Sequence, residues 1–427
     1  AVILDVIYNH LGPEGNYLGA YGHYFTNKYQ TPWGSALNYD DRGCDTVRDF
    51  VYDNVRQWFR DFHVDGLRLD AVHSIFDTGP RSVLAEIKIV ADEEGARRGW
   101  PAIIIAESNL NDVRLINPAE RGGYSHDAQW NDDFHHVVHT LLTGERDGYY
   151  ADFDRPTEQL VKALNDVFVY DGAFSPYRQR RHGAPAGDLP GRHFVVSVQT
   201  HDQVGNRACG ERLTSLVEPP QLRLAAALEL LSPYTPMLFM GEEYGESNPF
   251  PFFCDFGDED LREAVRRGRR EEFADFAWAG EVPDPQDEAT FRSAILTWSW
   301  PEGSWNAGLR RLYQELLALR RRWPALADDR HRSARLLPAS EGSALVELVR
   351  GDPARPDDRL IALFNCSPVA CPAPVSETPP GTILLRTESA RFGGTVSADE
   401  PTGDAALGAV MAPYECLVLK PSRENRE

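Results

Sequence analysis

Long apolar runs and an excess of positive charge are both absent from this sequence of 427 residues. No stretch approaches the ~18 apolar residues that cross a bilayer, so no membrane span is expected. Lys and Arg number 44 against 65 Asp and Glu, which gives a formal net charge of −21. Such a charge repels nucleic acid and anionic membrane surfaces, and we expect neither as a partner. It is compatible with a neutral substrate such as a sugar.

Cysteine is sparse and lacks the spacing of a metal or redox motif. None of the six residues forms a C-x-x-C pair, and they are scattered along the chain: Cys44, Cys209, Cys254, Cys366, Cys371 and Cys416. We therefore expect no zinc site, no cofactor and no disulfide framework. No signal peptide is visible, so the expected location is the cytoplasm.

Over residues 1–328, short apolar strands alternate with amphipathic helices, which is the pattern of a parallel sheet with helical crossovers. Strands are predicted at residues 2–6, 64–69, 102–106, 128–131, 194–199 and 237–240. After a cap at Asp45, helices are predicted at residues 47–62, 83–91, 134–142, 222–231 and 305–323, and Pro324 helps to end the last of them. The length suits one large and one smaller domain.

Past Asp328 the sequence changes to short strands separated by turns rich in Pro and Gly, such as residues 351–356. Strands are predicted at residues 345–349, 360–364, 383–385 and 416–419. We expect a catalytic domain at 1–328 and a small antiparallel β-sandwich domain at 329–427. The expected role of the small domain is structural cover for the large one, with independent sugar binding as the alternative.

Four predicted strands end in clusters of polar side chains. The clusters are D-V-I-Y-N-H at 5–10, D-G-L-R-L-D at 65–70, I-A-E-S at 105–108 and T-H-D-Q at 200–203. A single aspartate at such a place is more often a helix cap or half of an ion pair. Four clusters favour a shared site, because the C-terminal ends of barrel strands surround one axis and carry the catalytic residues of barrel enzymes.

Converging carboxyl groups suit the cleavage of a glycosidic bond. That reaction needs a carboxylate at the anomeric carbon and a carboxylic acid that protonates the leaving oxygen. Crowded carboxylates raise one another's pKa, which keeps one of them protonated, while Arg68 would hold its neighbour Asp70 ionised. A metal site is the alternative, but His10, His73 and His201 lie on separate segments without H-x-x-x-H spacing.

The four clusters resemble, in order, the four conserved regions of the α-amylase superfamily. The resemblance covers residues 1–327, and the following β domain resembles the superfamily's C-terminal domain. It implies an α/β fold with a (β/α)8 TIM barrel, in which Asp70 is the nucleophile, Glu107 the general acid/base and Asp202 the carboxylate that stabilises the distorted sugar. It also implies that Asn9 braces the first cluster and that four side chains contact the substrate: His10, Arg68, His73 and His201.

Further segments resemble one family within that superfamily, the malto-oligosyltrehalose trehalohydrolases. They are A-E-S-N-L-N-D at 106–112, Q-W-N-D-D-F-H-H at 129–136, L-L-T-G-E-R-D-G-Y-Y-A-D-F at 141–153, H-D-Q-V-G-N-R at 201–207 and P-M-L-F-M-G-E-E-Y-G-E at 236–246. Members of that family cut the α-1,4 bond next to the terminal trehalose of a malto-oligosyl chain.

This closer resemblance implies malto-oligosyltrehalose or another α-1,4-glucan as the substrate, and trehalose with a maltooligosaccharide as the products. It also implies functional coupling to a maltooligosyltrehalose synthase. Trehalose contacts are expected from polar residues that could equally be caps or surface residues: Asn111, Asp112, Asp132 and Asp133.

The sequence departs from the family pattern in three places. The first conserved region ends the third strand of the superfamily barrel, so the chain is expected to begin at strand three and to lack two β/α units and any N-terminal domain. Such a six-stranded sheet has open edges and is not expected to fold alone. Ala71-Val-His73-Ser stands where many α-amylases have Lys-His, which disfavours a calcium-dependent amylase. Asn109 stands where the family has an aspartate.

Two other functions compete with this hypothesis. A glycogen branching enzyme, or another glucan hydrolase of the α-amylase type, would use the same three carboxylates, because water and a sugar hydroxyl compete for one glycosyl-enzyme intermediate. The flanking segments favour hydrolysis. A non-catalytic carbohydrate-binding relative would be expected to lose a carboxylate, and all three are present.

Aromatic side chains could add sugar-stacking subsites. Trp58 and Trp305 fall on apolar helical stripes and are expected in the core. For Trp33 and Trp130 a core position and a subsite are equally compatible with the sequence. The full set of stacking candidates is Trp33, Tyr39, Trp130 and Phe134.

Overall fold

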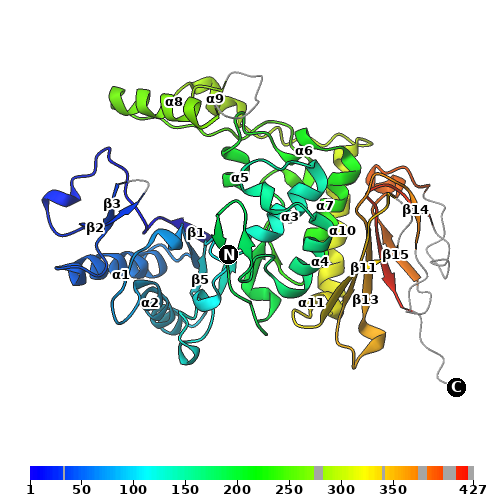
Figure 1. Ribbon diagram of the computed structural model, residues 1–427, viewed down its shortest axis with the longest axis horizontal. Helices are drawn as coiled ribbons and strands as arrows, with labels where there is room; N and C mark the ends of the chain where they lie inside the picture. Colours follow the sequence, from blue (N-terminus) through cyan, green and yellow to red (C-terminus); the bar gives the residue numbers. More distant parts are fainter. Residues whose placement is uncertain (32–33, 274–281, 339–341, 374–381, 398–409, 422–427) are drawn as a thin grey trace.

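The computed structural model describes residues 1–31, 34–273, 282–338, 342–373, 382–397 and 410–421. Its main feature is a six-stranded sheet whose strands are all parallel and follow one another in chain order (Figure 1). The strands are β1 (Ile3–Val6), β4 (Gly66–Leu69), β5 (Ile103–Ala106), β6 (Ala128–Trp130), β9 (Phe194–Val196) and β10 (Thr235–Pro236). Chain-order parallel strands with helical crossovers are the arrangement of a (β/α)8 barrel, which confirms the predicted fold class.

Close strand packing explains the glycine of the D-G-L-R-L-D segment. Gly66 opens β4 and pairs with Ile3 on one side and Ile103 on the other. A Cβ atom at this position would lie 2.6 Å from Ile3 Cδ1 and 2.8 Å from the Ile103 carbonyl oxygen. A side chain here would therefore force the neighbouring strands apart, which favours glycine.

Helices cover the outside of the sheet, as the apolar periodicity predicts. The larger ones are α1 (Cys44–Arg60), α2 (Val83–Arg98), α3 (Asp132–Thr143), α4 (Pro156–Asp166), α7 (Pro219–Leu231), α8 (Glu259–Phe273) and α10 (Trp305–Arg322). Shorter ones are α5 (His201–Gly205), α6 (Leu213–Leu216), α9 (Glu288–Ser293) and α11 (Pro324–Ala327), with 3₁₀ turns at η1 (Leu18–Ala20), η2 (Val72–Ser74), η3 (Val113–Leu115), η4 (Ala119–Arg121), η5 (Gly148–Asp152), η6 (Gly191–His193), η7 (Glu242–Tyr244), η8 (Pro356–Asp358) and η9 (Ala390–Phe392).

The structure corrects several predicted bounds. The last parallel strand is Thr235–Pro236, and the apolar residues 237–240 follow it as irregular backbone and the start of a turn. Asp45 lies in the first turn of α1, whose N-cap is Gly43 in the left-handed conformation (φ 78°). Helix α4 was not predicted; Pro156 begins it at the first helical position, where a proline costs no hydrogen bond.

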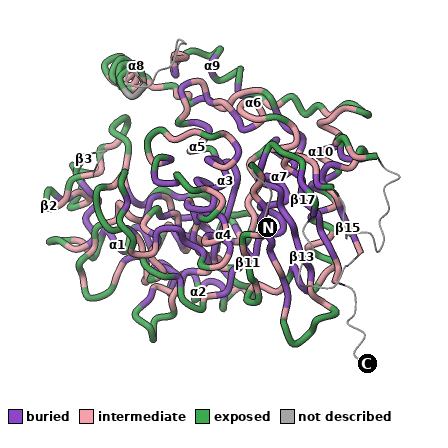
Figure 2. Tube along the Cα trace, turned by 45° about the vertical axis from the view of Figure 1, so that its right-hand side comes forward, coloured by how far each residue is buried: buried purple, intermediate pink, exposed green. Residues whose placement is uncertain are grey.

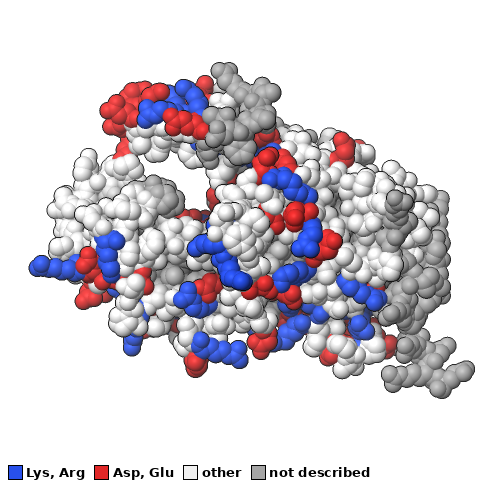
Figure 3. Space-filling model, viewed as in Figure 1, with Lys and Arg blue, Asp and Glu red and all other residues white. Residues whose placement is uncertain are grey.

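Two projections rise from the catalytic end of the barrel. One is the hairpin of β2 (Phe25–Thr31) and β3 (Gly34–Leu37), and the other is α8 (Figure 1). The loop after β1 contacts the segment just before α8, where Glu14 Oε1 accepts hydrogen bonds of 2.7 and 3.1 Å from the backbone N–H groups of Gly257 and Asp258. Figure 3 shows an open hollow between the two projections.

The C-terminal part is antiparallel, as predicted. A five-stranded sheet runs in the order β11-β12-β13-β17-β15, and β14 pairs with β16. The strands are β11 (Arg332–Leu337), β12 (Leu345–Arg350), β13 (Leu360–Asn365), β14 (Cys371–Pro372), β15 (Thr382–Arg386), β16 (Val410–Met411) and β17 (Cys416–Lys420), and the two-stranded β7 (Phe174–Ser175) and β8 (Arg180–Arg181) belong to the barrel. We propose the division into 1–328 and 329–427 at the connection between α11 and β11.

Helix α7 lies between the barrel and this β domain and is buried on all sides from Leu222 to Leu231 (Figure 2). Its Arg223 forms two hydrogen bonds of 2.7 and 2.8 Å with the carboxylate of Glu388 in the β domain, and both side chains are buried. Arg350 of β12 donates to the carbonyl oxygens of Leu231 and Ser232. Buried charge and backbone contacts therefore join the two parts. Among the described helices, none is both long enough and apolar enough to cross a membrane.

Candidate active site

Arg68 lies at the centre of the strand-end cluster. Its Nη1 donates to Asp5 Oδ1 at 2.7 Å and to Asp70 Oδ1 at 2.7 Å, and its Nη2 lies 3.6 Å from Glu107 Oε2. The guanidinium lies over the Trp130 ring, 4.1 Å from its centroid. Burial opposes the charge of Arg68, but the three carboxylates outweigh burial and raise its pKa. The side chain is thus a fixed cation that links three strands.

Asp70, which follows β4, is held by hydrogen bonds from neighbours on both sides. Arg68 contacts one carboxylate oxygen, and Asn9 Nδ2 donates to the other at 2.8 Å and to the Asp70 carbonyl oxygen at 2.8 Å. Both donors fix the orientation of the carboxylate. His10 and His73 also lie near Asp70; burial lowers the pKa of each, and the Asp70 charge partly opposes that effect.

Glu107, which follows β5, is a carboxyl group with a raised pKa. Burial raises its pKa to about 7, helped by the nearby charges of Asp70 and Asp202 and opposed by Arg68 and by the backbone N–H of Ala71. Ala71 donates that hydrogen bond to Glu107 Oε2 from a left-handed conformation (φ 39°), which is costly for a residue with a Cβ. A carboxyl group with this pKa is half protonated near neutral pH, as a general acid requires.

Asp202 lies on the other side of the cluster, in the first turn of α5. Thr200 caps this helix, its hydroxyl accepting from the Gln203 N–H. His201 Nε2 lies 3.5 Å from Asp202 Oδ1, and its ring meets the Trp130 ring edge-on at 6.2 Å between centroids. About half of the Asp202 side chain is exposed (48%), so its carboxylate is accessible to a ligand.

A fourth carboxyl group joins the three predicted ones. Asp132 is the first residue of α3, just past β6, and is half-buried. Burial raises its pKa to about 7, and the charges of Glu107, Asp133 and Asp202 add to this while Arg178 opposes it. Of the polar residues expected to contact trehalose, Asp132 is therefore the one that lies among the catalytic candidates.

An apolar hollow of about 430 Å³ opens beside the cluster along the barrel axis. Polar side chains and apolar strand residues share its lining: Asp5, Arg68, Trp130, His201, Met237 and Phe239 are examples. Trp130 therefore faces the site. Residues 237–239 of the apolar run that the sequence predicts as a strand line this hollow from the segment after β10.

Sequence comparison relates the chain to trehalose-releasing hydrolases. The malto-oligosyltrehalose trehalohydrolase of Saccharolobus solfataricus is 50% identical over 323 residues, which are 76% of this chain and 54% of that protein. The Arthrobacter ramosus protein of the same name is 47% identical over 353 residues, 82% of this chain and 60% of that protein. The chain thus spans little more than half the length of these relatives. No model of a protein family matches it.

Comparison of structures decides the family. A Salmonella typhimurium protein assigned to the α-amylases superposes on 99% of this chain with a TM-score of 0.82 at 35% identity, and the chain covers 68% of it. The chain belongs to the α-amylase family. The α-amylase of Geobacillus thermoleovorans, solved with acarbose, has the same fold at 16% identity, with a TM-score of 0.57, covering 99% of this chain and 77% of that one.

In this α-amylase-family chain, three of the residues expected to contact trehalose make hydrogen bonds or ion pairs within the protein. Asn111 is buried, and its amide donates to Asp133 Oδ2 and to the Tyr170 carbonyl oxygen, both at 2.9 Å. Asp133 also accepts from the backbone N–H groups of Val169 and Tyr170. Asp112 caps η3 and pairs with Arg114. These contacts fix the loops that follow β5 and β6.

The aromatic candidates divide in the same way. Tyr39 and Phe134 are fully buried, and the Tyr39 hydroxyl donates to the Tyr8 carbonyl oxygen at 2.7 Å, so both are core residues. Trp58 and Trp305 are partly buried and pack against the core, as predicted. Trp33 lies outside the described residues.

Sequence reasoning missed three parts of the site. Both carboxylate oxygens of Asp5 accept from Arg68 Nη1, but Asp5 was given no role from the sequence, although it begins the first polar cluster. The Ala71 N–H and Arg178 were not considered at all. A signal existed only for Asp5, because a backbone N–H carries no residue identity and Arg178 lies in a loop far from any predicted strand end.

Proposed function

We propose that the protein is a retaining glycoside hydrolase that cuts the α-1,4 bond next to the terminal trehalose of malto-oligosyltrehalose. The observation that carries this is one buried arginine, Arg68, that contacts both the Asp70 side chain and Glu107, a carboxyl group whose pKa is raised. Identities of 50% and 47% to malto-oligosyltrehalose trehalohydrolases support the substrate.

The proposed chemistry uses Asp70 as the nucleophile and Glu107 as the acid. Asp70 attacks the anomeric carbon while Glu107 gives its proton to the glycosidic oxygen, so the C–O bond breaks as the glycosyl-aspartate bond forms and trehalose leaves. Glu107, now ionised, takes a proton from water; the resulting hydroxide displaces Asp70 and leaves an α-configured maltooligosaccharide. Asp202 stabilises the distorted sugar through its hydroxyls, and water enters only after trehalose departs.

The departing trehalose must lie on the side of Glu107, because that residue protonates the bond to it. Asp132 lies on this side and shares the electrostatic environment of Glu107. We therefore assign Asp132 to the recognition of trehalose hydroxyls, with His10, His73 and His201 on the sugar that is attacked. A site that hydrogen-bonds particular hydroxyls penalises a ligand that leaves its polar groups unpaired.

The test is a comparison of kcat/KM for maltotriosyltrehalose and for maltopentaose, which have equal numbers of glucose units. We expect trehalose-ended chains to be cut at least ~100-fold faster, with free trehalose as product. In Asp132→Asn the preference should shrink, because an amide replaces the acceptor, while cleavage of maltopentaose changes less. Equal values for the two substrates in the wild-type protein would refute the assignment.

A branching enzyme is the second candidate, since the chain is 26% identical over 235 residues to the 1,4-alpha-glucan branching enzyme GlgB of Mycolicibacterium paratuberculosis. New α-1,6 branches formed from amylose would favour it. The hydrolase needs a supplier, an enzyme that converts the reducing end of a maltodextrin into an α,α-1,1 linkage, and we propose coupling to such a synthase. A cytoplasmic location accords with six cysteines that are all free thiols.

A further inference from the structure

Glu145 lies where two segments of the active site meet. Arg207 forms a two-pronged contact with its carboxylate, Nη1 to Oε2 and Nη2 to Oε1, both at 2.9 Å. His139 Nε2 lies 2.7 Å from Oε2. These three side chains come from the ends of α3 and α5, and we call them the Glu145 clamp. Two-pronged contacts between arginine and a carboxylate fix orientation as well as distance.

One arm of the clamp leads to Asp202 through a single turn of backbone. Arg207 lies five positions after Asp202, and the intervening chain is α5 and its end. The Asn206 N–H bonds to the Asp202 carbonyl oxygen at 2.9 Å, and the Arg207 N–H to that of Val204 at 3.1 Å. The backbone of Arg207 is therefore joined to that of Asp202 through a hydrogen-bonded turn.

The other arm leads to Asp132 along α3. His139 is buried on α3, where its ring stacks on that of Tyr150 at 4.4 Å and 15°. Glu145 follows the helix end directly, and its N–H donates to Thr143 Oγ1, which in turn donates to the His139 carbonyl oxygen. Asp132 begins the same helix, so α3 carries both His139 of the clamp and the residue assigned to the departing trehalose.

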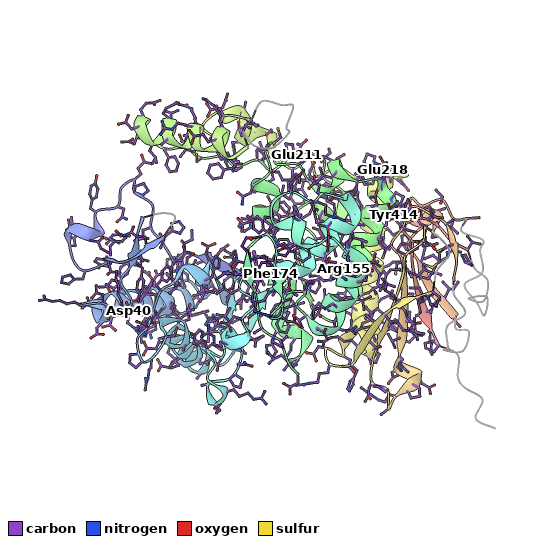
Figure 4. The ribbon with its side chains drawn as sticks, viewed as in Figure 1. Asp40, Arg155, Phe174, Glu211, Glu218 and Tyr414 are labelled. Carbon is purple, nitrogen blue, oxygen red and sulfur yellow. The ribbon has the colours of Figure 1, made fainter. Side chains whose placement is uncertain are left out.

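Glu145 and Arg207 of the clamp form an ion pair at neutral pH. Hydrogen bonding from His139 lowers the pKa of Glu145 to about 2, with Arg207 adding to the effect and burial opposing it. Arg207 is partly buried, and the Glu145 charge raises its pKa against the effect of burial. Glu211, labelled in Figure 4, lies 3.5 Å from Arg207 Nε and adds a second negative charge.

We propose that Glu145, Arg207 and His139 are positioning residues, which set Asp202 on α5 against Asp132 on α3 and so align the attacked sugar with the departing trehalose. This extends the proposed function, since it assumes that both residues face the substrate. Glu145 and Arg207 belong to two separate segments that resemble the trehalose-releasing family, L-L-T-G-E-R and H-D-Q-V-G-N-R. The contact between the two side chains joins these segments in the folded protein.

Two substitutions test the clamp. Arg207→Lys keeps the positive charge but loses the two-pronged contact, and Glu145→Gln keeps the shape but loses the charge. For each we expect kcat to fall at least ~10-fold with KM within about twofold, because misplaced groups slow the chemical step. The double variant should lose no more than the worse single one, since both act as a unit. In an Asp202→Asn background, Arg207→Lys should cause no further loss of the residual turnover.

Arg223→Lys is the matched control, because Arg223 makes the same contact with Glu388 between α7 and the β domain, away from the carboxylates. We expect it to lower the Tm and leave kcat unchanged. The measurements use the full-length protein with maltotriosyltrehalose and with maltopentaose as substrates. Equal loss of Tm and kcat in the two lysine variants, or unchanged kcat in both clamp variants, overturns the proposal. If wild type cuts both substrates equally, the trehalose assignment fails, while a selective loss of kcat on either substrate still supports the clamp.

Discussion

Replacing Arg68 by methionine tests the charge arrangement most directly, because this one guanidinium contacts three carboxylates. Its Nη1 lies 2.7 Å from Asp70 Oδ1, and its Nη2 lies 3.6 Å from Glu107 Oε2. Methionine keeps an apolar stem of similar length above Trp130 and removes the charge. The substitution therefore separates the effect of the cation from the effect of filling the space.

The first expected effect is a loss of rate. A hydrogen bond to a charged group contributes about 1.5–3 kcal/mol, and ~1.4 kcal/mol corresponds to a factor of ten. Loss of the Asp70 contact alone should therefore lower kcat/KM by about 10- to 150-fold at the pH optimum. Asp5 loses its partner too, which adds to the loss.

The second effect is a shift of the pH profile. Glu107 must be protonated to act as the acid, so kcat/KM falls as the pH rises through its pKa of about 7. Arg68 lowers this pKa, so its removal should raise it and move the alkaline limb to higher pH. At pH values above the optimum, the lost contact lowers kcat/KM while the higher pKa of Glu107 keeps more of the enzyme protonated and active. A lower maximum together with an alkaline limb at higher pH therefore identifies the loss of the Arg68 charge.

The assay is kcat/KM for maltotriosyltrehalose from about pH 4 to pH 10, which reports the groups of the free enzyme. Arg68→Lys is the control: it retains the charge, so its alkaline limb should stay close to that of the wild type even if its rate falls. An alkaline limb of Arg68→Met that moves to lower pH, or a wild-type rate in that variant, would refute the electrostatic account.

Three further predictions concern the same site. Asp70→Asn, Glu107→Gln and Asp202→Asn should each reduce turnover by several orders of magnitude and non-additively; a variant that keeps a tenth of the rate does not belong to the trio. The first-formed reducing end should be α by proton NMR, with the carboxyl groups of Asp70 and Glu107 about 5–5.5 Å apart, and a β product would indicate inversion. Activity should survive chelators, because the Lys-His element of calcium amylases is missing and the described residues hold no group of His, Cys, Asp or Glu that could bind a metal ion; loss in chelator with recovery in calcium would contradict this.

Much of the fold could be predicted because each strand and helix of the barrel has a recognisable apolar pattern within its own residues. Buried parallel strands are short apolar runs, and β1, β4, β5 and β6 begin and end within two residues of their predicted bounds. Helix α10 likewise shows its apolar stripe at helical spacing. The error at β10 has a physical cause: residues 237–239 line the hollow beside the carboxylates, and an apolar run that lines a hollow cannot be distinguished from a buried strand in the sequence.

The sequence predicts which residues lie at the site, but it does not predict what surrounds each of their side chains. Strand-end residues such as Asp70 are placed by the strand before them, so their convergence follows from the fold class. Asn111 and Asp132 look alike in sequence as polar residues just past a strand, yet one is buried in bonds to its neighbours and the other faces the carboxylates. That difference depends on side-chain direction in loops, which has no periodicity.

Long-range contacts mark the limit most clearly. The Glu145–Arg207 contact joins residues 62 positions apart, and nothing in either segment alone predicts the other. The same holds for the acid: the sequence supplies Glu107, but its pKa near 7 comes from burial and from the charges of Asp70 after β4 and Asp202 on α5. Since a carboxyl group at its ordinary pKa would be ionised at neutral pH and unable to donate a proton, the assembled barrel, more than the residue itself, makes Glu107 an acid.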